Sequence, residues 1–116
     1  MEPVEINAGR WYLRALRSDE RVDDRPALAD GGITDPDYIA RRSAGWADET
    51  ALSWAVCEPT TGELLAEIVL IPGPDGTAAL TGWSRPGYSE VFTESAPTVR
   101  RFAEAALGYT LTSEPV

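Results

Sequence analysis

The chain has 116 residues, of which 43% are hydrophobic, so we expect one domain with a sizeable core. Its formal net charge of −9 argues against naked nucleic acid and anionic membrane surfaces as partners, because both repel an acidic chain. A cationic peptide or amine is electrostatically easier to attract, although the acidity can also serve solubility alone.

The composition also excludes several kinds of site. The sequence contains no His, which removes the commonest general base and the commonest metal ligand. Its single cysteine, Cys57, cannot form an internal disulfide, and the apolar run before it predicts a small buried side chain. No apolar run approaches the ~20 residues that span a bilayer, and the first ten residues lack a signal-peptide core. We therefore expect a cytoplasmic protein.

The N-terminal half predicts one strand and two helices. Residues 1–9 read as a lead-in, and the alternation in residues 10–17 predicts a strand. Residues 18–30 predict a short, irregular helix that Pro26 interrupts. A clearer helix follows with Asp35 as its N-cap. The apolar face of this second helix consists of Ile39, Ser43 and Trp46.

The middle of the chain predicts a three-stranded antiparallel meander. Residues 51–57 alternate as a half-buried strand does, and residues 63–71 form an apolar strand covered on both faces. Residues 77–84 predict the third strand. Two turns rich in Pro and Gly separate these strands, and connections this short favour antiparallel neighbours.

The C-terminal part predicts a loop, a helix and a short strand. The loop covers residues 87–95, and the helix begins with Ser95 as its N-cap and Pro97 in its first turn. Gly108 ends this helix, and residues 109–112 form a last strand. The predicted fold is α+β, a mostly antiparallel sheet with helices on its faces, in the order β-α-α-β-β-β-α-(β).

The element order and the local sequence of residues 51–108 resemble the GNAT N-acetyltransferase superfamily, in its branch that acetylates protein N-termini and small amines. The resemblance implies acetyl-CoA or another acyl-CoA as cofactor and an amine or peptide N-terminus as acceptor. Residues 10–108 match the first half to two-thirds of such a domain. The resemblance thus implies that residues 1–116 form a single GNAT-like domain lacking the usual C-terminal strands and helix. The open edge of its last strand predicts a homodimer or a sheet-completing protein partner.

The resemblance places the acyl-CoA signature across residues 89–95. Glu90 and Phe92 stand where the family has glycines, which let the backbone approach the cofactor pyrophosphate closely. Here Glu90 places a negative charge at that position, and Phe92 places a bulky side chain there. Five residues are the candidates for cofactor binding: Trp83, Ser84, Ser89, Val91 and Thr93. The alternative is an ordinary strand-to-helix loop.

Glu67 is the candidate catalytic residue, because it lies in the middle of the apolar run LLAEIVLI and burial would suit a base. The alternative is a carboxylate that is paired with Arg or faces an edge. Trp54 is a candidate wall of the acceptor pocket, although Trp on a sheet face is more often core. These features predict a GNAT-family acyltransferase-like protein that is weak or inactive. The alternative is a non-catalytic binding or regulatory module that acts through a protein partner or homodimer.

Overall fold

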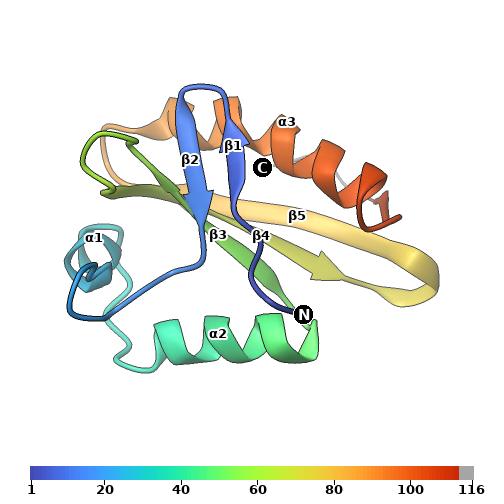
Figure 1. Cartoon of the computed structure of the whole chain (residues 1–116), viewed down its shortest axis with the longest axis horizontal. Helices are drawn as coiled ribbons and strands as arrows, with labels where there is room; N and C mark the ends of the chain where they lie inside the picture. Colours follow the sequence, from blue (N-terminus) through green and yellow to red (C-terminus); the bar gives the residue numbers. More distant parts are fainter. Residues whose placement is uncertain (113–116) are drawn as a thin grey trace.

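The computed structural model describes residues 1–112, which form one six-stranded sheet between two helical layers (Figure 1). The strands lie in the sheet in their chain order, with α3 on one face and α1 and α2 on the other. The elements are β1 (Ile6–Ala8), β2 (Trp11–Arg14), α1 (Arg25–Asp30), α2 (Tyr38–Asp48), β3 (Leu52–Cys57), β4 (Leu64–Pro72), β5 (Thr77–Ser84), α3 (Ser89–Ala105) and β6 (Thr110–Leu111). The predicted α+β class is confirmed.

The central strands β3, β4 and β5 form the predicted antiparallel meander. The buried apolar side chains form two clusters: a larger one that includes Trp46, Leu80 and Val99, and a smaller one that includes Leu16, Leu28 and Leu64. Trp54 and Val56 of β3 face the larger core cluster, and Ala55 and Cys57 face the smaller one. All six residues of β3 are buried, so the prediction of a half-buried strand is wrong. The reason is that helices cover both faces of the sheet, which an alternating sequence does not reveal.

The N-terminal segment is more regular than the sequence indicates. Residues 6–8, predicted as a lead-in, form β1 and pair antiparallel with β2. A tight turn joins the two strands, with Gly9 at φ +65°, where a residue without Cβ is favoured. β2 ends at Arg14, three residues before the predicted end of the strand.

The two helices on the second face begin later than predicted. Pro26 lies in the first turn of α1, so it opens this helix rather than interrupting it. Asp37, not Asp35, is the N-cap of α2, while the Asp35 carboxylate accepts a hydrogen bond from the Asp37 amide at 2.8 Å. Trp46 is buried as predicted, whereas Ser43 is exposed. Among residues 1–112, no helix is long and apolar enough to cross a membrane.

Helix α3 is the largest departure from prediction, since it begins at Ser89 and includes the segment predicted as a loop. Ser95, the predicted N-cap, is buried inside the helix and donates to the Val91 carbonyl at 2.6 Å. Pro97 lies in the helix interior, where it removes one backbone hydrogen bond. The apolar face of α3 packs on the sheet, and this tertiary contact outweighs the local cost of proline.

The strand β6 is short and pairs parallel with β5 through residues 77–78 only. It confirms the last predicted strand. Within residues 1–112, the outer edge of β5 therefore has no strand partner from Ala79 to Ser84. This open edge leads to the N-terminus of α3.

The ionisation of the Cys57 thiol provides a test of how far water is excluded from the smaller core cluster. The side chain is fully buried, and burial raises the pKa of its thiol from 9.0 to about 12, with the Arg14 charge acting in the opposite direction. The pKa of this thiol is higher in the folded protein than in the unfolded protein. Its contribution to the free energy of unfolding is therefore fully present below pH 9 and is lost as the pH rises toward 12. Between pH 8 and pH 10, wild type should lose roughly 1 kcal/mol more unfolding free energy than Cys57→Ala in urea titrations. Equal losses in both proteins would contradict this.

Candidate functional site

A pocket of about 320 Å³ lies where β5 ends and α3 begins. Gly82 and Ser84 are two apart on β5 and so share one face of the strand, while positions 89, 92 and 93 share one face of the helix. The residues that line this β5–α3 pocket are Gly82, Trp83, Ser84, Ser89, Phe92 and Thr93. The structure thus brings together three of the five predicted cofactor residues, Ser84, Ser89 and Thr93, whereas Trp83 borders the pocket but donates its Nε1 hydrogen bond to Glu67 on the opposite face of the sheet.

Val91, the fifth predicted cofactor residue, lies elsewhere. Its side chain is fully buried in the larger core cluster, and its amide donates to the Tyr88 carbonyl at 3.0 Å. The prediction placed residues 89–95 in a loop. Because these residues are helical, Val91 turns toward the sheet instead of toward the pocket.

Polar hydrogen-bonding groups gather at the mouth of the β5–α3 pocket. The N-cap residue Tyr88 makes no side-chain capping bond, and the first amides of a helix have no intrahelical acceptor. The Ser84 hydroxyl is buried and has no hydrogen-bond partner among the described residues. Both features favour a polar or anionic ligand group here. Glu90 opposes an anion, because its carboxylate lies in the same first turn.

Glu67 lies on the opposite face of the sheet, fully buried among three hydrogen-bond donors. Its Oε1 accepts from the Tyr38 hydroxyl at 2.5 Å and from Trp83 Nε1 at 2.8 Å, and its Oε2 accepts from Arg42 Nε at 3.0 Å. Arg42 also donates to the Tyr38 hydroxyl at 2.8 Å. Glu67 and Trp83 are direct cross-strand neighbours on β4 and β5. The carboxylate is therefore paired with Arg, as in the alternative interpretation of the sequence.

Within this Glu67 cluster (Tyr38, Arg42, Glu67 and Trp83), the pKa values of Tyr38 and Arg42 are both raised. Burial raises the pKa of Tyr38 above 10, and the hydrogen bond to Glu67 raises it further. Burial is the largest influence on the pKa of Arg42 and lowers it, but the Glu67 charge and the interactions with Tyr38 together outweigh burial and raise the pKa overall. The phenol therefore stays protonated and the guanidinium stays charged.

The sequence interpretation did not select Tyr38 or Arg42. The available signal was their spacing, because residues four apart on a helix share a face and so can meet one carboxylate together. The spacing alone does not indicate that α2 lies over β4 at the position of Glu67. That relation comes from tertiary structure.

Trp54 lies in the core rather than at the wall of a pocket. Its side chain is fully buried, and its Nε1 donates to the Val4 carbonyl at 2.7 Å. Its ring packs edge-on against Trp46 and Phe102, at centroid distances of 5.1 and 5.9 Å. The strand alternation turns this side chain toward the larger cluster, so the structure does not bring it to an acceptor site.

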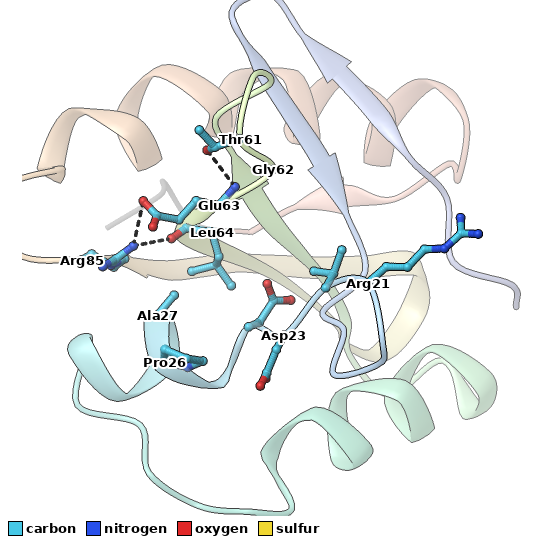
Figure 2. Close-up of a pocket in the computed structure, with 11 residues that line it drawn as sticks. Arg21, Asp23, Pro26, Ala27, Thr61, Gly62, Glu63, Leu64 and Arg85 are labelled. Atoms are coloured by element: carbon cyan, nitrogen blue, oxygen red, sulfur yellow. Dashed lines mark hydrogen bonds and ion pairs between the residues drawn. The ribbon is translucent and has the colours of Figure 1, made fainter.

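A second cavity, of about 340 Å³, lies beside α1 and the turn between β3 and β4 (Figure 2). Asp23, Glu63 and Arg85 are among its lining residues, and none of the predicted site residues reaches it. Arg85 pairs with Glu63 at 3.3 Å, and Asp23 pairs with Arg25 at 2.8 Å. Its acidic groups are thus engaged by arginines of the same chain, which makes this cavity a weaker candidate for a ligand site than the β5–α3 pocket.

Comparison with solved structures gives three informative matches. A structure described as a ribosomal-protein-serine acetyltransferase from Vibrio cholerae superposes with a TM-score of 0.76 at 17% identity, covering 93% of this chain and 71% of that protein. An acetyltransferase from Agrobacterium tumefaciens str. C58 gives 0.69 at 19% identity, covering 96% and 73%. A GCN5-related N-acetyltransferase from Brucella melitensis gives 0.59 at 19% identity, covering 94% and 58%.

No protein-family model matches this sequence, and no curated protein does. The three similar structures are all described as acetyltransferases, and each match extends over more than nine-tenths of this chain. At identities below 20%, such likeness establishes shared architecture. The chain therefore has the α+β fold of the GNAT acetyltransferases.

Proposed function

We propose that this chain is a GNAT-type acyltransferase-like protein, weak or inactive as a catalyst, that binds acyl-CoA along β5 and in the β5–α3 pocket. The observation that carries the proposal is the open outer edge of β5 from Ala79 to Ser84, which leads to the helix N-terminus. A free strand edge offers backbone groups that can pair with an extended chain containing amides, such as the pantetheine arm of CoA.

The polar mouth of the pocket suits the phosphate-bearing part of the same ligand. Ser84, Ser89 and Thr93 supply hydroxyls there, and the first turn of α3 supplies amides. Glu90 weakens this attraction, so we expect a lower affinity than a neutral or basic first turn would give.

The surroundings of Glu67 lead us to expect slow acyl transfer. Glu67 remains our candidate base, but its uptake of a proton would leave the Arg42 guanidinium without its anion. The residue opposite Glu67 on β5 is Trp83, so no second acid lies beside Glu67 on that strand. Each of these features reduces the means for deprotonating an amine.

The proposed acceptor is a small amine or a peptide N-terminus. The net charge of −9 attracts cationic groups, and the similar Vibrio cholerae structure is described as acting on a ribosomal protein. The acceptor class can be screened by following thiol release from acetyl-CoA.

Calorimetric titration with acetyl-CoA and with free CoA tests the proposed site. We expect binding in wild type, and weaker binding in Ser84→Ala. Because the Ser84 hydroxyl has no partner within the described residues, its removal should leave the stability nearly unchanged, so that lost affinity reports on the ligand. Absence of heat at millimolar ligand would overturn the proposal.

The alternative is a non-catalytic module that acts through a homodimer or a protein partner. The pairing of Glu67 with Arg42 favours it, because the buried carboxylate then has a structural role. The open edge of β5 would in this case pair with another polypeptide. Light scattering across a dilution series tests the homodimer, and a monomer at every concentration would argue against it.

A further inference from the structure

We propose that Phe92 limits ligand binding in the β5–α3 pocket, because its ring closes the inner end of the pocket above Gly82. The inference rests on the function proposed above, since it concerns how an acyl-CoA would enter the same pocket. It assigns an affinity-limiting role to one side chain.

The contact between Phe92 and Gly82 is unusually close. A Cβ atom built on Gly82 would lie 2.3 Å from Phe92 Cε2 and 2.2 Å from the Glu67 carbonyl oxygen. The phenyl ring therefore occupies the volume over β5 that a side chain at position 82 would take. Phe92 is only 6% exposed, yet it lines the pocket, so the pocket ends against this ring.

The pocket changes character from its mouth to its inner end. Ser84 and Ser89 lie at the mouth, where the strand ends and the helix begins. Gly82 lies farther back along β5, and Phe92 lies one turn farther along α3. A ligand chain that follows the open edge from Ser84 toward Ala79 has to pass Gly82. At that point it meets the ring on the face of the sheet that carries α3. Removal of the ring would extend the pocket toward the middle of β5.

The test is to titrate Phe92→Leu and Phe92→Ala with acetyl-CoA and with free CoA. We expect the Kd to fall roughly tenfold relative to wild type, the effect of burying about two further CH₂ groups. Phe102→Leu is the matched control, because Phe102 is the other of the two phenylalanines and lies on the same helix against Trp54. Circular dichroism establishes which variants are folded, and Phe92→Leu decides if the alanine variant unfolds.

Each outcome has a defined meaning. Tighter binding by Phe92→Leu but not by Phe102→Leu supports the role of Phe92. Binding by wild type that Phe92→Leu leaves unchanged or weakens overturns this role and leaves the proposed function standing. Binding by Phe92→Leu alone supports the role and shows that the wild-type pocket is closed to CoA, against the proposed function. No binding by any folded variant overturns both.

Discussion

Asp24→Ala is expected to lower the free energy of unfolding by about 3–5 kcal/mol, because it leaves a buried guanidinium without its anion. Arg14 donates to both oxygens of Asp24 at 2.8 Å, and the two side chains are only 5% and 3% exposed. Asp24 also accepts from the Arg17 amide at 2.7 Å, which ties the segment after β2 to the start of α1. Urea denaturation of the two proteins at pH 7 measures the difference.

The neighbouring Asp23→Ala is the matched control for this prediction. Asp23 makes a similar pair with Arg25 at 2.8 Å, but both groups are exposed to water, where such pairs contribute little. Replacement of the buried pair by Arg14→Met with Asp24→Leu should recover most of the lost stability, since no charge is then left unpaired. Equal destabilisation by Asp23→Ala and Asp24→Ala would contradict the argument.

Arg42→Met is expected to cost about 3 kcal/mol, because Glu67 would remain fully buried without a counter-ion. We place this at the lower end of the range for buried pairs, since the Arg42 side chain is 27% exposed and solvent partly screens the interaction. Methionine keeps most of the apolar stem, so the change reports mainly on charge. Thermal and urea unfolding both measure it.

Arg41→Met provides the comparison on the same helix. Arg41 pairs with Asp35 on the exposed side of α2, with exposed fractions of 60% and 41%. The change should therefore have little effect on stability. If Arg41→Met destabilised the protein as much as Arg42→Met, the loss would reflect helix formation rather than the buried pair.

The sequence by itself predicted the meander of β3, β4 and β5 and the order of most elements. This succeeded because alternation of side chains and short turns rich in Pro and Gly are local properties. The same local reasoning identified Ser84, Ser89 and Thr93, which do meet in one pocket. It also singled out Glu67 as unusual, because a carboxylate inside an apolar strand needs a partner.

The tertiary structure decided the start of α3 and the surroundings of Glu67. Local rules place Ser95 and Pro97 at a helix start, but packing of Val99 and its neighbours on the sheet stabilises helix from Ser89 onward. The partners of Glu67 come from α2 and β5, which are distant in sequence and meet only when the sheet is covered. The position of Phe92 over Gly82 is likewise a contact between two elements, because its cause is the close approach of α3 to β5.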